Sequence, residues 1–175
     1  MAINLTNTYP VTTPPYQTSM ELGSLYTIAH RQFRYCALEA FNDDILQAGV
    51  FVTLETNSLG VNIAKQLSSA VDVIYGVSYL NTLNIATWNN MLGAFEFPSG
   101  TNISIISEGD IWMYAEAAVT MGSPVYTRHT ADGLLTRIGA LAGAAGTGLV
   151  QVPGAKFLKT ITTSGKVPVS LPDII

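Results

Sequence analysis

The residues of this chain that could do chemistry are few, and their spacing matches no catalytic or metal-binding pattern. His30 and His129 lie far apart, and no cysteine cluster or HExxH helix accompanies them, so we interpret both as structural histidines. Glu108 and Asp110 form a carboxylate pair around Gly109. An aspartate beside a turn glycine is explained by hydrogen bonds to nearby main chain, without acid–base work. We therefore expect no catalytic residue, no bound metal and no cofactor.

Three further patterns of enzymes are incomplete. Residues 139–148 (GALAGAAGTG) are glycine-rich like a phosphate-binding loop, but no Lys-Ser or Lys-Thr pair follows them. No serine lies in a GxSxG turn, as a hydrolase of that class requires. Cys36 is the single cysteine, so the chain forms no internal disulfide, and its apolar neighbours predict a buried, inert thiol. The sequence contains no enzymatic signal.

The composition indicates a subunit of a larger assembly. Charged residues make up 11% of the 175 residues, against about 25% in ordinary soluble domains. So little charge suits a protein that buries surface against partners, and a compact monomer rich in small residues is the alternative. The net charge of −4 argues against nucleic acid, whose phosphates call for a basic stripe.

The charges are unevenly distributed along the chain. Acidic residues dominate from Glu39 to Glu116, and basic residues dominate from Arg128 to Lys166. The two regions could pair between neighbouring subunits or with a charged lattice, and ordinary solvated strand faces are an equally good explanation. Residues 1–13 lack the features of a signal peptide, and no apolar run reaches about 18 residues. We therefore expect synthesis in the cytoplasm and no membrane contact.

The elements that must position these residues are strands. Residues 1–23 contain Pro10, Pro14 and Pro15 and are predicted to form an extended arm. Residues 24–175 are predicted to form a single β domain. Its first part, residues 24–41, fits a helix and a strand equally well.

Period-2 alternation of apolar residues predicts short strands over most of this domain. Glycine-centred turns at 108–110, 121–124 and 131–133 open three runs at the spacing of an antiparallel sandwich or barrel. In the first run, Ile111, Met113 and Ala115 should face one side, and in the second Val125, Thr127 and His129 should oppose Tyr126, Arg128 and Thr130. Further strands are expected at 45–54, 71–80, 103–106, 149–152, 155–161 and 166–171. Residues 81–100 are expected to be a long connection and 139–148 a flexible segment. The predicted fold is an all-β, antiparallel, jelly-roll-like sandwich or barrel.

Five short segments carry a resemblance to a known family. They are EGDIWM at 108–113, TMGSPVY at 120–126, AKFL at 155–158, the closing VPVSL at 167–171 and the early AHR at 29–31. Together, along about residues 20–172, they resemble the cement, or capsid decoration, proteins of tailed bacteriophages. In that family such segments recur along a β fold of jelly-roll type.

The resemblance implies a mechanical function in the virion. Such a protein sits on the outer surface of the phage head, bridges subunits of the major capsid protein and stabilises the shell, and we expect it to form dimers or trimers. Many copies on a lattice gain avidity, so each contact can be modest. A barrel that binds a small molecule or glycan between Trp88, Trp112, Tyr114 and Tyr126 is the alternative hypothesis, and a tail or connector subunit is a third.

Overall fold

The structure is all β. The computed structural model describes residues 22–23, 40–42, 45–80, 86–89, 93–172 and 174 of the chain. These residues contain thirteen strands and no helix, so the predicted all-β class is confirmed. Most strand pairs are antiparallel and the strands close into barrels, whereas nothing in the strand order specifies a jelly roll. The described part likewise contains no helix long and apolar enough to span a membrane.

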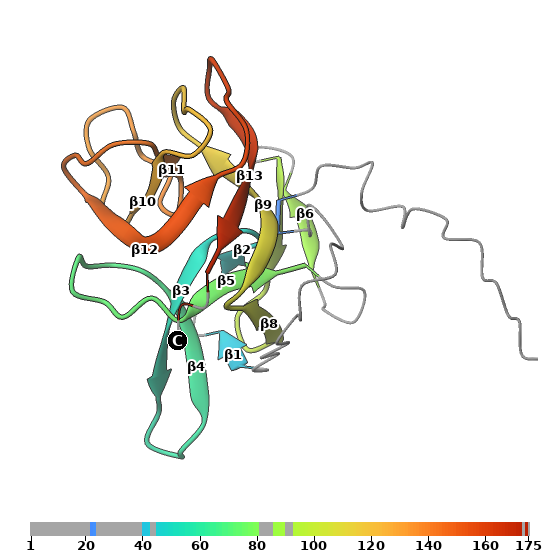
Figure 1. Ribbon diagram of the computed structural model, residues 1–175. Coiled ribbons are helices and arrows are strands. Elements are labelled where there is room, and N and C mark those ends of the chain that lie inside the picture. Colours follow the sequence, from blue (N-terminus) through green and yellow to red (C-terminus); the bar gives the residue numbers. More distant parts are fainter. Residues whose placement is uncertain are drawn as a thin grey trace, which may run out of the picture.

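The first barrel lies in the lower half of Figure 1. Its five strands are β1 (Ala40–Asn42), β3 (Phe51–Thr56), β4 (Asn62–Gln66), β5 (Gly76–Tyr79) and β8 (Asn102–Ile106). They close in the order β1-β4-β3-β5-β8. β1 and β4 run parallel, and the other four pairs are antiparallel.

The second barrel lies above the first in Figure 1. Its strands are β9 (Gly109–Ala115), β10 (Pro124–Arg128), β11 (Leu141–Ala142), β12 (Leu149–Phe157) and β13 (Gly165–Leu171). They close in the order β10-β11-β9-β13-β12. β9 and β11 run parallel, and the other four pairs are antiparallel.

The two barrels have the same topology. When the strands of each barrel are numbered along the chain, both rings have the order 1-3-2-4-5, and strands 1 and 3 form the parallel pair in both. Strand direction cannot alternate all the way round a ring of five, so one parallel pair is unavoidable. Its position is not dictated by that argument, yet it is the same in both rings. The chain therefore contains one barrel topology twice in tandem.

A three-stranded sheet is inserted into the first barrel. It consists of β2 (Leu46–Gln47), β6 (Thr87–Asn89) and β7 (Ala94–Phe97), in the order β2-β7-β6. The prediction that residues 81–100 are a connection is therefore wrong, because they contain the β6–β7 pair. Strands of three and four residues are too short to produce a visible period-2 pattern. The predicted strand 45–54 is likewise divided between β2 and β3.

One apolar core joins the two barrels. Phe51 and Val77 of the first barrel lie in the same buried cluster as Ile111 and Met113 of the second. The predicted alternation of β9 is confirmed, since Ile111, Met113 and Ala115 are all fully buried. A second cluster packs the first barrel against the three-stranded sheet. Because burial of apolar surface is the main favourable term in folding, the shared cluster holds the barrels together.

The predicted strand 71–80 is shorter than expected. Only Gly76–Tyr79 pairs with other strands, and the side chains of Val71 and Val73 are 88% and 75% exposed. The Asp72 carboxylate closes a turn instead, accepting a hydrogen bond from the Ser68 amide at 2.7 Å. Local turn chemistry thus outweighs the β propensity of the two valines.

Residues 149–157 form one strand where two strands, 149–152 and 155–161, were predicted. β12 continues through Pro153 and Gly154, which were expected to make a turn. β10 pairs with β12 on both sides of them, at Val152 and at Lys156, and the register shifts in between. A bulge of this kind accommodates a proline and a glycine, which look like a turn in the sequence.

Residues 139–148 are not a uniformly flexible segment. They include β11, and both Ala140 and Leu141 are fully buried. Leu141 lies in the core cluster of the second barrel. The prediction is wrong because small side chains let β11 approach β9 and β10 closely, and a single leucine then fills the interior.

Leu22 and Gly23 belong to the folded body. Leu22 is 2% exposed, the Gly23 amide donates to the Trp112 carbonyl at 2.7 Å, and the Leu80 amide donates to the Gly23 carbonyl at 3.0 Å. These are the last two residues of the predicted arm, 1–23. The remainder of the predicted arm lies outside the described residues.

Candidate functional site

The candidate catalytic groups do not form a common site in the described structure. His129 follows β10 and is half-buried, with Nδ1 2.8 Å from the hydroxyl of the next residue. Glu108 and Asp110 are half-buried at the start of β9. Among the described residues, no three His, Cys, Asp or Glu side chains lie close enough to hold a metal ion. His30 and Cys36 lie outside the described residues.

A buried ion pair fixes one end of the second barrel. Arg128 is the last residue of β10, and its Nε and Nη2 donate to the two carboxylate oxygens of Glu116 at 2.7 and 2.6 Å. Its Nη1 donates to the carbonyls of Thr130 at 3.2 Å and Thr147 at 3.1 Å. The hydrogen bonds to Glu116 raise the pKa of Arg128 above its ordinary value. One guanidinium thus fastens the end of β9 to the β10–β11 and β11–β12 connections.

Sequence reasoning missed this pair. The alternation in β10 placed Arg128 on the face opposite Val125 and Thr127, and the charge distribution counted it among the basic residues of the C-terminal region. Val125 and Thr127 are indeed fully buried, but the Arg128 side chain is also only 2% exposed. Glu116 directly follows β9, and Arg128 is the last residue of β10. The position of two opposite charges at the ends of successive predicted strands was the available signal. Because its side chain is buried, Arg128 does not contribute to the basic surface that the charge distribution suggested.

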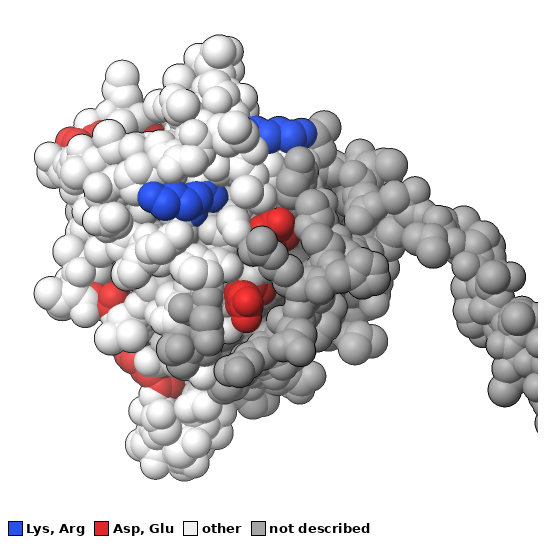
Figure 2. All heavy atoms as spheres, in the orientation of Figure 1, with Lys and Arg blue, Asp and Glu red and all other residues white. Residues whose placement is uncertain are grey.

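Two other basic side chains lie over aromatic rings. The Arg137 guanidinium lies 4.1 Å from the ring centroid of Tyr114 and donates to Gln47 Oε1 at 3.0 Å, which connects the second barrel to the three-stranded sheet. Burial lowers the pKa of Arg137. Lys159 Nζ lies 5.7 Å from the ring centroid of Trp112. Figure 2 shows two separate basic patches in the upper half of the visible face, within a surface that is mainly uncharged.

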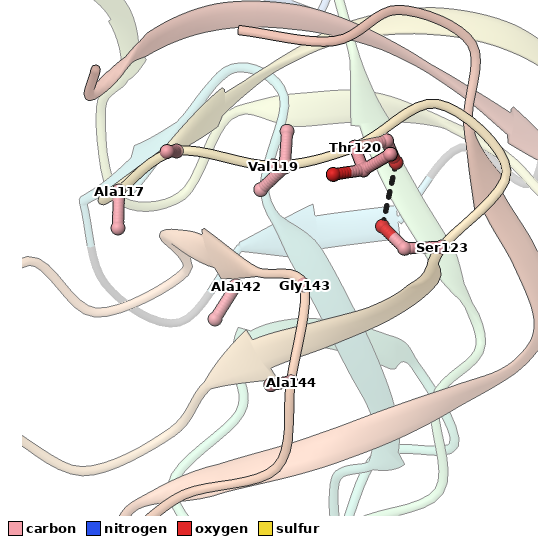
Figure 3. A pocket seen from close by; sticks show the side chains of 8 residues that line it. Ala117, Val119, Thr120, Ser123, Ala142, Gly143 and Ala144 are labelled. Atoms are coloured by element: carbon pink, nitrogen blue, oxygen red, sulfur yellow. Dashed lines mark hydrogen bonds between the residues drawn. The ribbon is translucent and has the colours of Figure 1, made fainter. Parts of the chain in front are cut away.

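A shallow hollow of about 320 Å³ opens on the second barrel. It is lined by residues 117–120 and Ser123 of the β9–β10 connection and by residues 142–144 after β11 (Figure 3). The Ser123 hydroxyl donates to the Thr120 carbonyl at 2.7 Å. All of its lining side chains are small or uncharged, so the hollow contains no group for acid–base chemistry.

Exposed apolar side chains are concentrated in the connections between strands. Leu59 is 84% exposed between β3 and β4, and Val71 and Val73 are exposed between β4 and β5. Met121 is 65% exposed between β9 and β10, and Leu134 is 100% exposed between β10 and β11. Large apolar side chains in solvent are typical of contact surfaces when they recur in one region. The loops, rather than a cleft, are the candidate functional site.

The aromatic residues of the alternative hypothesis lie on different sheets and outside the hollow. Trp88 belongs to the three-stranded sheet, where it packs edge-on against Phe95 with ring centroids 5.1 Å apart. Trp112 is only 6% exposed on β9 of the second barrel. The hollow of Figure 3 is lined by neither tryptophan, nor by Tyr114 or Tyr126.

Two comparisons with known proteins give matches. A family model described as structural cement protein (E217 gp24/Pam3 gp6) matches residues 10–171. A solved chain from "The capsid of Myoviridae Phage XM1" has a similar fold, with a TM-score of 0.63 over 88% of this chain and 91% of that chain. Its sequence is 17% identical, so it supports the fold alone. No curated protein matches the sequence.

Proposed function

The chain belongs to the family of phage structural cement proteins, and we propose that it binds the outer surface of the phage head and bridges subunits of the major capsid protein. Its role is structural and its place is the virion. The observation that carries the proposal is the family match, which extends over residues 10–171 and so includes both barrels. The apolar loops and the low charge of the chain support attachment to a protein surface.

We further propose that the protein has no catalytic activity. The support is physical: Glu108 lies in the bend before β9 and Asp110 lies on β9. His129 Nδ1 lies 2.8 Å from the Thr130 hydroxyl, and in the described part of the chain no three His, Cys, Asp or Glu side chains could hold a metal ion. General acid–base catalysis needs a group within hydrogen-bonding reach of a substrate in a defined site. The only hollow described above has an uncharged lining.

We propose that residues 24–175, together with Leu22 and Gly23, act as one domain and that residues 1–21 are an arm that binds a neighbouring subunit. The core cluster shared by the two barrels supports the single domain. Deletion of residues 1–20, which spares Leu22 and Gly23, should leave the melting temperature nearly unchanged and weaken attachment to shells. Thermal melting and co-sedimentation measure the two effects, and a truncated protein that does not fold would contradict the proposal.

We also propose that the protein forms dimers or trimers on the shell, because symmetric positions on a closed lattice favour closed symmetric assemblies. Sedimentation equilibrium of the free protein tests this. A species that stays monomeric at all concentrations would contradict self-association in solution.

The central experiment adds the purified protein to shells that lack it. Bound protein is measured by co-sedimentation, and shell strength by the temperature at which the shells rupture. We expect saturable binding and a higher rupture temperature. Protein that stays in the supernatant, or binds without strengthening the shells, would overturn the proposed function.

A further inference from the structure

The same connection in each barrel is a hairpin with an exposed leucine. The second and third strands of the first barrel, β3 and β4, pair antiparallel up to Thr56 and Asn62. The second and third strands of the other barrel, β10 and β11, also pair antiparallel. Leu59 is 84% exposed at the first hairpin and Leu134 is 100% exposed at the second. The repeated topology therefore places a solvent-exposed leucine at equivalent positions.

The first tip, residues 57–61, is a tight and well-bonded turn. The Asn57 side-chain oxygen accepts hydrogen bonds from the amides of Leu59 at 2.9 Å and Val61 at 3.0 Å. The Asn57 amide donates to the Val61 carbonyl at 2.9 Å. Gly60 has φ +77°, a conformation that other residues adopt only with strain. These contacts fix the main chain of the tip, and the Leu59 side chain extends from it into solvent.

The second tip, residues 132–135, is built in a related way. The amide of Asp132 donates to the Leu135 carbonyl at 3.0 Å, and the amide of Leu135 donates back at 2.9 Å. Gly133 has φ +56°. Each tip thus combines an Asn or Asp that closes the turn, a glycine with positive φ and an exposed leucine. A loop whose main chain is already fixed loses less conformational entropy when its side chain docks than a flexible loop does.

The two tips do not serve one pocket. In Figure 1 the β3–β4 hairpin projects at the bottom of the molecule, whereas the connections of β10, β11 and β12 lie at the upper left. Points that are well separated in one view are at least that far apart in space. The chain therefore offers two chemically matched, separated contacts, and such a pair suits a partner that presents the same apolar pocket more than once.

We propose that Leu59 and Leu134 dock into equivalent apolar pockets on two neighbouring copies of the major capsid protein. This inference rests on the proposed function and specifies how one chain bridges the shell: each barrel contributes one leucine tip to one subunit. Two linked contacts bind more tightly than either alone, by about 10²–10⁴-fold where the spacing fits. A chain with one tip removed would still attach, but it would no longer join two subunits.

The test uses Leu59→Ser, Leu134→Ser and the double variant, with Thr163→Ser as the control. Thr163 is an exposed polar residue of the β12–β13 connection, outside the apolar loops. The two leucines are exposed by 84% and 100%, so none of the variants should change the melting temperature of the free protein. Binding to shells that lack the protein is measured by co-sedimentation over a concentration series, and rupture temperature is measured at saturation.

We expect each single tip variant to bind at least 10-fold more weakly than the wild type, in line with the loss of avidity, and to give no strengthening even at saturation. The double variant should not bind, and Thr163→Ser should behave as the wild type. If wild-type protein binds and strengthens shells but the tip variants do so equally, or only one tip matters, the inference is wrong and the proposed function stands. If the wild type does not bind, the proposed function fails and the inference falls with it.

Discussion

Replacement of Glu116 by glutamine should destabilise the protein strongly. In the folded state the side chain of Arg128 is 2% exposed and that of Glu116 8% exposed, and their closest approach is 2.6 Å. Glu116→Gln keeps the size of the side chain but removes its charge. The guanidinium then remains buried beside the Thr130 and Thr147 carbonyls without an anion.

The magnitude follows from the burial of both groups. Removal of one partner of a buried ion pair costs about 3–5 kcal/mol, because the other charge stays desolvated and uncompensated. For a protein of this size each kcal/mol corresponds to about 2–4 °C in Tm, so Tm should fall by about 6–20 °C. The pKa of Arg128 is raised in the folded protein. The stabilisation that corresponds to this shift is present below the pKa of arginine in the unfolded chain. It is lost only as pH rises through the pKa of Arg128 in the folded protein. The loss in Glu116→Gln should therefore be constant between about pH 6 and 9.

The assay is thermal and urea unfolding of the free protein, with Glu55→Gln as the matched control. Glu55 pairs with Lys65 at 2.8 Å, but the side chains are 59% and 36% exposed. An exposed pair contributes about 0–1 kcal/mol, so this variant should melt within about 4 °C of the wild type. A second variant, Glu116→Leu with Arg128→Met, replaces the pair by apolar groups and should recover most of the lost stability.

Equal melting temperatures for Glu116→Gln and Glu55→Gln would refute the reasoning. That result would mean that burial of the Arg128 guanidinium does not raise the cost of losing its partner. A double variant that melts below Glu116→Gln would also count against it, because the buried charge would then not be the cause of the loss.

Three other predictions concern the close contact between Gly49 and Gly23, the turn at Asp72 and the two histidines. Gly49→Ala should lower Tm more than Gly100→Ala. The two glycines have nearly equal φ of +76° and +77°, but only at Gly49 would the new Cβ atom lie 2.6 Å from the main-chain nitrogen of Gly23. Equal Tm values for the two variants would exclude this clash. The pKa of Asp72 is lowered, chiefly by the hydrogen bond from the Ser68 amide. The turn is therefore stabilised above the ordinary aspartate pKa, and this stabilisation is lost as pH falls through the lower pKa of the folded protein. In an NMR titration the Ser68 amide signal should follow the carboxylate, and a midpoint at the ordinary aspartate pKa would contradict the prediction. Replacing both histidines with glutamine should leave attachment to shells within a few-fold of the wild type, and loss of attachment in the co-sedimentation assay would show that a histidine has a direct role.

The local pattern of the sequence determined the strands whose two faces differ. In β9, Ile111, Met113 and Ala115 alternate with larger and more polar residues, and the structure buries all three. The turn predicted at residues 131–133 forms at the second leucine tip, where Gly133 has positive φ. Such features depend on neighbours within a few residues, so a single sequence is enough to reveal them. The same segments carried the resemblance to phage cement proteins.

The tertiary structure decided which local signals prevailed. Val71 and Val73 have high β propensity but lie in a loop, whereas Leu141 in a stretch of glycine and alanine becomes a core residue. Arg128 was counted among the basic residues of the C-terminal region, but its side chain is buried and is neutralised by Glu116, which directly follows β9. The exposure of Leu59 and Leu134 was equally invisible, since an exposed and a buried leucine look the same in a sequence.

The pairing of strands was decided by contacts between distant residues. β1 pairs with β8, and β9 pairs with β13, so in each barrel the first strand along the chain pairs with the last. The hydrophobic period shows that a strand has an inner face, but it contains no information about which other strand completes its hydrogen bonds. Closure leaves no unpaired edge, and both rings have the strand order 1-3-2-4-5. Only the folded chain therefore shows that two like barrels stand in tandem, each with an apolar tip at the same place.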